Sequence, residues 1–100
     1  MPQQRRWESI ARAESILQTE KECFITGSKA QLDLHHVYAG NNRDQSDSWG
    51  CWVWLRHDIH KSLHDQDKEM DRMIRRICQE RFEELYGHET FMKVFGKSYL

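Results

Sequence analysis

The sequence has little of three features that often reveal a protein's class: excess charge, paired cysteines and long apolar runs. Its 15 Lys and Arg residues nearly balance 16 Asp and Glu residues, for a formal net charge of −1. This balance does not indicate a nucleic-acid binder, although a bound metal and a few clustered arginines can create a positive site that the net charge hides. With 38% hydrophobic and 31% charged residues over 100 positions, the composition is typical of one soluble globular domain.

The three cysteines, Cys23, Cys51 and Cys78, are odd in number and widely spaced, which is a poor basis for a disulfide framework. No stretch approaches the roughly 20 apolar residues of a membrane span, and residues 1–16 lack the apolar run of a secretory signal. We therefore expect a reduced, cytoplasmic protein that has no membrane partner.

The hydrophobic pattern predicts helices towards both ends of the chain and two strands in the middle. Residues 23–27, CFITG, suit a strand or a tight turn, and the apolar-poor stretch AGNNRDQSDS predicts a loop of about ten residues between the strands. Asp58 is a plausible N-cap for the helix after the second strand, and Gly87 can end the long helix that follows. The predicted elements are an amphipathic helix over 3–22, strands over 32–38 and 51–55, and helices over 58–64 and 67–86, followed by one or two apolar turns.

Histidines are concentrated in the middle of the chain, where five of the six fall between residues 35 and 64. His60 and His64 are four positions apart, so a helix places both imidazoles on one face, within reach of a single ion. His35 and His36 are adjacent on the preceding strand, and a hairpin packed on a helix brings the two elements together. Three imidazoles leave positions open for water and phosphate, as a catalytic metal requires. The fourth can take a proton from water, provided that the strand ends or twists there, since adjacent strand residues point to opposite faces.

The segments LHHVYAG, CWVWL and HKSLH, in this order around a turn-rich loop, resemble the HNH family of ββα-metal endonucleases. More narrowly, HHVYAGNNRDQSDSWG is similar to small HNH proteins encoded by bacteriophages and prophages of Gram-positive bacteria. The resemblance covers about residues 23–64. It implies an α+β fold in a single domain, 1–100, whose ββα-metal core (23–64) lies between an N-terminal helix (1–22) and a C-terminal helical extension (67–100).

The resemblance also implies a role for each of four histidines. His35, His60 and His64 would hold one divalent metal ion (Mg²⁺, Mn²⁺, Ni²⁺ or Zn²⁺), and His36 would be the general base. The implied activity is metal-dependent hydrolysis of DNA phosphodiester bonds, which leaves 5′-phosphate and 3′-hydroxyl ends. DNA is then the expected partner, with phage packaging or recombination proteins as further candidates, in the cytoplasm of a bacterial host.

One departure from the family pattern concerns the base. The family's middle Asn, which usually orients it, falls on Cys51, nine residues before His60. A thiol is a weak substitute, so a backbone carbonyl, or Asn41 or Asn42 from the loop, would have to orient His36. The missing Asn favours a rival interpretation, a catalytically silent HNH fold that binds DNA or a phage protein.

A second departure concerns structural zinc. Many relatives carry two CxxC knuckles, whose positions here are Cys23…Thr26 and Arg56…Ile59. Only one of four thiols remains, so we expect no structural zinc site. A third interpretation is a small helical interaction protein whose histidines are incidental, and metal content would separate it from the other two.

Several other polar residues have plain structural interpretations. Asp33 is either a further ligand or a carboxylate that supports a nearby histidine. His57 matches no role in the family pattern and is expected to be solvated, and His88 is expected to follow the long helix, after Gly87. Cys78 lies among apolar helix positions and is expected in the core.

Basic residues suggest two places for phosphate binding. The run Arg72, Arg75 and Arg76 is diluted by acidic neighbours, which favours a solvated helix over DNA binding. Arg43 and Lys61 are closer to the histidines in the sequence and are the better phosphate-binding candidates.

Overall fold

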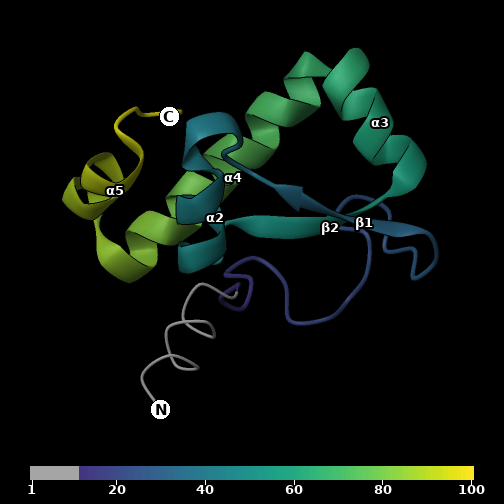
Figure 1. Ribbon diagram of the computed structural model, residues 1–100, viewed down its shortest axis with the longest axis horizontal. Helices are drawn as coiled ribbons and strands as arrows, with labels where there is room; N and C mark the ends of the chain where they lie inside the picture. The colour runs from purple at the N-terminus through teal and green to yellow at the C-terminus, as the bar shows by residue number, and fades with distance from the viewer. Residues whose placement is uncertain (1–11) are drawn as a thin grey trace.

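The computed structural model describes residues 12–100 and combines one two-stranded antiparallel sheet with helices packed around it (Figure 1). The predicted α+β class is therefore confirmed. Within the described residues, no helix is long and apolar enough to cross a membrane. In chain order the elements are β1 (Leu32–His36), the 3-10 turn η1 (Gly40–Asn42), α2 (Arg43–Trp49), β2 (Trp52–Arg56), α3 (His57–Asp65), α4 (Lys68–Tyr86) and α5 (His88–Phe95).

The hairpin register decides which residues share a face of the sheet. His35 pairs with Val53, and His36 pairs with Trp52. Val53 and Leu55 are fully buried, whereas Trp52 is half-buried, as the alternation of a pleated strand requires. His35 therefore lies on the buried face and His36 on the opposite one.

β1 ends at His36, two residues earlier than predicted. Beyond it, the Val37 N–H still donates to the Cys51 carbonyl at 3.0 Å. The Tyr38 backbone leaves the sheet and exchanges two hydrogen bonds with the Ser46 hydroxyl, at 3.2 and 2.7 Å. Because Ser46 is fully buried, this exchange satisfies its hydroxyl and fixes the exit of the chain from the sheet.

The predicted loop between the strands is wrong, since η1 and α2 occupy most of it. Gly50 ends α2 in the left-handed conformation at φ 74°, a common helix stop. Trp49, the last residue of α2, packs against Phe82 and Tyr86 of α4, with ring centroids 5.2 and 5.0 Å away. This tertiary packing stabilises a helix of seven residues that would be marginal by itself.

The predicted N-terminal helix is also wrong over residues 12–22, which have no regular secondary structure. Residues 3–11 of that prediction lie outside the described part of the chain. The Ile16 N–H donates to the Gly50 carbonyl at 2.9 Å, so the segment lies against the end of α2. A side chain at position 50 would collide with the Glu14 carbonyl, which explains the need for glycine at this close approach.

Residues 12–24 cover the edge of β2 that β1 does not use. The Ser15 hydroxyl donates to the Trp52 carbonyl at 2.7 Å. The Trp54 N–H donates to the Gln18 side-chain carbonyl, and the Trp54 carbonyl accepts from the Phe24 N–H, both at 2.8 Å. These bonds need an extended segment, which is why an amphipathic pattern does not produce a helix here.

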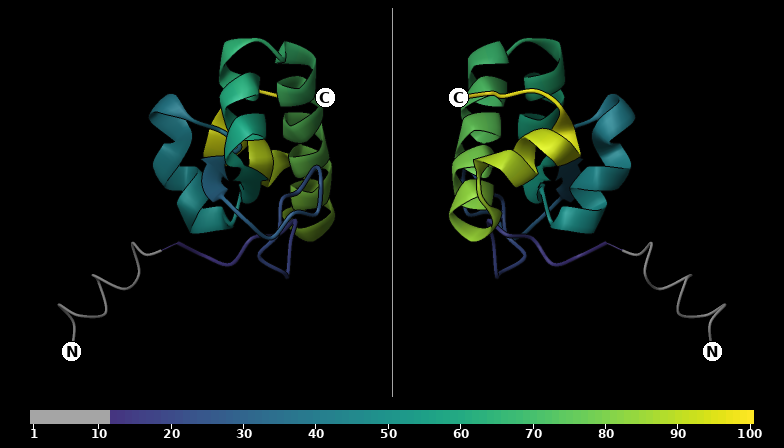
Figure 2. Two further views of the ribbon diagram at one scale, coloured as in Figure 1. Left: turned by 90° about the vertical axis from the view of Figure 1, so that its right-hand side faces the viewer. Right: turned by 90° about the vertical axis from the view of Figure 1, so that its left-hand side faces the viewer.

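The two helices after the hairpin agree with the predicted ranges, and α3 and α4 lie side by side (Figures 1 and 2). The Asp67 carboxylate caps α4 by accepting from the Met70 N–H at 2.9 Å, and Gly87 ends the helix. The prediction of Asp58 as an N-cap is wrong. Its carboxylate pairs with Arg56 at 2.6 Å and lies inside the first turn of α3.

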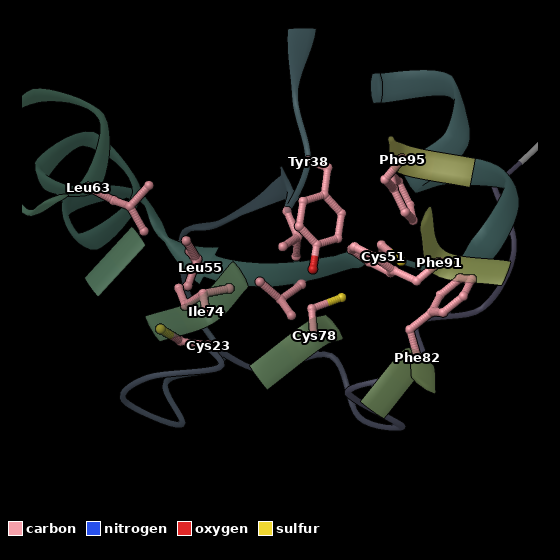
Figure 3. Packing of buried hydrophobic residues seen from close by; sticks show 12 residues of the cluster. Cys23, Tyr38, Cys51, Leu55, Leu63, Ile74, Cys78, Phe82, Phe91 and Phe95 are labelled. Atoms are coloured by element: carbon pink, nitrogen blue, oxygen red, sulfur yellow. The ribbon is translucent and has the colours of Figure 1, made fainter. Parts of the chain in front are cut away.

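Buried apolar residues from β2, α3, α4, α5 and the segment that follows β1 form one core (Figure 3). Tyr38 lies near its middle, with ring centroids of Phe91, Phe95 and Tyr99 at 5.5, 4.6 and 5.0 Å. Its hydroxyl donates to the Arg75 carbonyl at 2.7 Å. The core thus fixes β1 against α4 and α5, close to the paired histidines.

Candidate metal centre

Three histidine side chains from two elements converge on one point. His35 comes from β1, and His60 and His64 come from successive turns of α3. One ring nitrogen of each lies within 4.8 Å of the others, and the ring centroids are 5.2, 5.7 and 4.8 Å apart. The structure thus brings together, at metal-binding distance, the three residues that the sequence predicts as ligands.

His35 offers a nitrogen that no group in the described part of the chain satisfies. Its side chain is buried, with 4% exposure, and its Nε2 has no hydrogen-bond partner among the described residues. Burial, together with the nearby His60 and His64, lowers the pKa of His35 to about 3. The imidazole is therefore neutral at physiological pH, which is the form that ligates a metal. A buried, neutral, unpartnered nitrogen is the donor that a metal ion fits.

The spacing of the other two ligand nitrogens also fits an ion. His60 Nε2 and His64 Nε2 are 3.2 Å apart. Two nitrogens about 2.0–2.1 Å from a tetrahedral ion lie about 3.3–3.4 Å from each other. The two rings are therefore already near the separation that a shared ion requires.

Asp33 lies behind the ligands. Its Oδ2 accepts from His60 Nδ1 at 3.0 Å and from His57 Nδ1 at 2.7 Å. These hydrogen bonds, that of His60 first, hold the pKa of the Asp33 carboxyl below its usual range. With the proton on Nδ1, His60 directs an unprotonated Nε2 at the centre. Of the two roles open to Asp33, the structure therefore shows the supporting carboxylate, and His57 has a partner that the sequence did not predict.

His36, the expected general base, faces a different element. Its Nε2 donates to Asp47 Oδ1 of α2 at 2.8 Å, and Arg12 Nε donates to the same oxygen at 2.9 Å. The ring is partly buried, with 19% of the side chain exposed. With Nε2 protonated, Nδ1 is the nitrogen that can accept a proton. Asp47, and not a cysteine, asparagine or backbone carbonyl, orients this ring.

Cys51 does not serve the role that the family alignment gave it. Its side chain is fully buried and lies against the Cys78 thiol. The hydrogen bond with Cys78, together with burial, raises the pKa of Cys51. Its carbonyl accepts from the Val37 N–H at 3.0 Å. Cys51 is thus a core residue, and Cys78 is in the core as expected.

The two predicted phosphate-binding residues are not gathered around the histidines. Arg43 is exposed at the start of α2, which lies apart from α3 at the other end of the hairpin (Figure 1). Lys61 is exposed on α3 and lines a small hollow with Asp58 and Asp65. The cation whose charge reaches His35 is instead Arg75 of α4.

Sequence reasoning therefore missed Asp47, and it placed Arg75 on a solvated helix face rather than near His35. The segment DQSDSW followed by Gly50 carries a helix-stop signal that could have placed Asp47 on a helix, but not beside His36. Comparisons with family models, curated proteins and solved structures find no match. The geometry of the centre suits one divalent ion, which the three imidazoles would hold while leaving further coordination positions open.

Proposed function

We propose that this chain is a small HNH-type endonuclease that hydrolyses DNA phosphodiester bonds with one divalent metal ion. His35, His60 and His64 hold the ion, and Asp33 orients His60. When bound, the ion supplies charge stabilisation for a phosphate oxygen and for the leaving oxygen. The proposed setting is the cytoplasm of a bacterial host, in a protein encoded by a phage or prophage.

The observation that carries this proposal is the convergence of the three imidazoles, together with a buried Nε2 of His35 that has no hydrogen-bond partner in residues 12–100. Structural zinc sites usually close all four positions with protein ligands, whereas three-histidine sites keep one position open for chemistry. His60 also has the supporting carboxylate that metal-ligating histidines usually have. A three-ligand site with such support favours a catalytic ion over a structural one.

The proton would be handled by His36 in this proposal. Asp47 accepts the Nε2 proton and so stabilises the imidazolium that forms when Nδ1 takes a proton from water. Arg12 shares the same oxygen and limits the movement of the carboxylate. The proposal requires His36 to reach the centre from the sheet face opposite His35, where the hairpin register places it.

A second candidate function is a metal-binding module of the same fold that binds DNA or a phage protein without cleaving it. One observation favours it: the hairpin register places His36 on the opposite sheet face from His35. A base directed towards α2 would then act in positioning α2 and the N-terminal segment rather than in catalysis.

The test is a plasmid-nicking assay. The protein is stripped with EDTA and supplied with Mg²⁺, Mn²⁺, Ni²⁺ or Zn²⁺, and metal content is measured in parallel. His36→Ala should keep the metal and lower cleavage by roughly two to four orders of magnitude, the usual contribution of a general base. His35→Ala should lose both metal and cleavage. His88→Ala, at a histidine of α5 that pairs with Glu83, is the matched control and should change neither.

The outcomes separate the two candidates. If wild type cleaves and His36→Ala does not, the nuclease stands with His36 as base. If wild type binds metal and DNA but cleaves neither plasmid nor single strands with any of the four metals, the silent binding module replaces it. A wild-type protein that takes up no metal would contradict both.

A further inference from the structure

A second polar feature lies where α4 meets the segment after α5. Together they line an open hollow of about 450 Å³, which we call the basic hollow. Its charged side chains are one carboxylate, Asp71, and five cations. In a chain with a net charge of −1, this is a strong local concentration of positive charge. The cations are Lys68, Arg72, Arg75, Arg76 and Lys97.

Buried polar contacts hold the C-terminal segment against α4, over which it crosses back (Figure 2). Gln79, which is fully buried, accepts from the Tyr99 N–H at 2.6 Å and donates to the Ser98 hydroxyl at 3.1 Å. The Tyr99 ring then attracts two cations, since the Arg75 guanidinium and the Lys97 ammonium are each 5.4 Å from its centroid. Two cations of the hollow are thus ordered before a ligand arrives, which lowers the entropic cost of binding.

Most of the positive charge is available to a ligand. Among the described residues, Arg75 alone of the five cations has a carboxylate partner, Asp71 at 3.1 Å. Lys68, Arg72 and Arg76 follow at four-residue intervals, so they form a row of about 12 Å along α4. Such a row suits a series of regularly spaced anions, and the phosphates of one DNA strand recur about every 3.4 Å along the duplex axis.

The basic hollow and the candidate metal centre are linked through Arg75. Arg75 belongs to the hollow, and its carbonyl accepts from the hydroxyl of Tyr38, three residues along the chain from His35. On the other side of the row, Glu69 and Glu80 line a separate hollow. Its only cations are Arg72 and Arg76, which also line the basic hollow. These carboxylates repel a polyanion and direct it to the side where Lys97 lies.

From this arrangement we infer that the basic hollow binds the phosphate backbone of nucleic acid and so docks the strand that enters the metal centre. The docking of a strand at the metal centre rests on the proposed nuclease function, whereas the binding of the phosphate backbone does not. Contacts of this kind are independent of base sequence. The Tyr99 ring packs on Tyr38 at 5.0 Å, so it is engaged in the core and does not provide a stacking platform for bases.

The test measures the binding of a fluorescein-labelled DNA duplex by anisotropy, in EDTA, over a series of salt concentrations. Arg72→Gln with Arg76→Gln removes two exposed cations of the hollow. Lys29→Gln with Lys93→Gln removes two exposed cations elsewhere, on the irregular segment before β1 and on α5, and matches the change in net charge. The hollow variant should bind about tenfold more weakly and reduce the slope of log K against log salt by about two. The control should bind like wild type.

Equal weakening of both double variants would overturn the inference, because net charge and not the hollow would then govern binding. A wild-type protein that binds no duplex would overturn it as well. Binding to vesicles that contain phosphatidylserine, with no binding to duplex, would assign the hollow to a membrane surface and also overturn it. Circular dichroism of both double variants shows whether any loss reflects unfolding.

Failure of this inference is distinguishable from failure of the proposed function. If the wild type never nicks plasmid but the hollow variant loses duplex binding, the hollow stands without the nuclease. If the wild type nicks plasmid and both double variants bind and nick equally, the nuclease stands without the hollow.

Discussion

The two ends of the hairpin are stabilised by different means. At the end where α2, α4 and α5 meet, Phe82 contacts Trp49, Phe91 and Phe95, with ring centroids 5.2 to 5.9 Å away. At the other end, Leu63 is the one fully buried residue of α3 and Ile59 packs partly buried against the core, while the histidines of α3 face β1. Figure 3 shows the labelled phenylalanines gathered at one end and Leu63 alone on α3 at the other.

This difference explains how a small domain can carry a polar centre. The aromatic end contains large, fully buried rings, and the burial of such apolar surface drives folding. The histidine end carries candidate metal ligands in place of buried apolar residues. A bound ion can there stabilise the fold in place of apolar burial. We therefore expect the aromatic end to be insensitive to metal and the histidine end to depend on it.

The largest effect is expected from emptying the aromatic end. Phe82→Ala removes a fully buried ring and should lower the free energy of unfolding by about 3–5 kcal/mol. Urea titrations should give the same loss in EDTA and with added metal, because the ring does not touch the centre. A loss that differs between the two conditions would show that the two ends are coupled.

The next effect is expected from the metal itself. A ligand at 100 times its dissociation constant stabilises the native state by about 2.7 kcal/mol, so added metal should raise the stability of the wild type by this order. His60→Ala should remove most of this gain, whereas His88→Ala should keep it. Urea unfolding with and without metal, with calorimetry for affinity, measures both. Equal gains in the two variants would contradict the assignment of His60.

The pH dependence of the metal-free protein sharpens the comparison. The pKa of His35 is about 3 in the folded state and roughly 6.5 in an unfolded chain. As the pH falls, the unfolded chain takes up this proton first. His35 therefore contributes its full stability above about pH 6.5, and this is lost towards about pH 3, by at most about 1.4 kcal/mol per pH unit. Urea titrations in EDTA between about pH 3 and pH 6.5 should show the free energy of unfolding falling as the pH falls. The His35→Leu variant should lack the contribution of His35 to this pH dependence.

A smaller effect, on metal affinity, is expected from Asp33, which lies behind the candidate ligands. Asp33→Asn removes the charge that orients His60 and should weaken metal binding about 10- to 100-fold. Competition with a chelating dye measures the dissociation constant. Asp58→Asn, at an exposed carboxylate of α3, is the control and should change little. Complete loss of binding in Asp33→Asn would instead identify Asp33 as a direct ligand.

The smallest effect is expected at Cys23. This residue begins a tight turn rather than a strand: the Gly27 N–H donates to its carbonyl at 2.8 Å, and the Thr26 N–H approaches its sulfur at 3.4 Å. Burial raises the pKa of Cys23, but hydrogen bonds from Thr26 and the Arg56 backbone leave the pKa below its ordinary value.

Cys23→Ser should therefore cost about 1–2 kcal/mol, as for an ordinary small core change. Metal content, measured by elemental analysis, should stay as in the wild type, because Thr26 stands where the second thiol of a knuckle would be. Release of zinc together with unfolding would show that Cys23 belongs to a structural metal site.

Local sequence patterns determined much of this molecule. The spacing of His60 and His64, the cap at Asp67 and the stop at Gly87 depend on neighbours within a few residues, so the helices at α3 and α4 were predictable. The alternation of β2 was predictable for the same reason. The position of His35 near the α3 histidines was predictable because a hairpin followed by a helix has few ways to pack.

Contacts between residues distant in the sequence decided the course of residues 12–22, the formation of α2 and the pairing of the polar groups. Residues 12–22 have a helical pattern but lie along β2, since the strand edge needs hydrogen-bond partners. α2 forms where composition indicates a loop, because Trp49 is buried against α4. The partnership of His36 with Asp47 and the gathering of Arg75 with Lys97 around Tyr99 join elements whose relative positions no local pattern specifies. Sequence periodicity determines which face of an element is apolar, whereas only packing of the whole chain decides which polar groups meet.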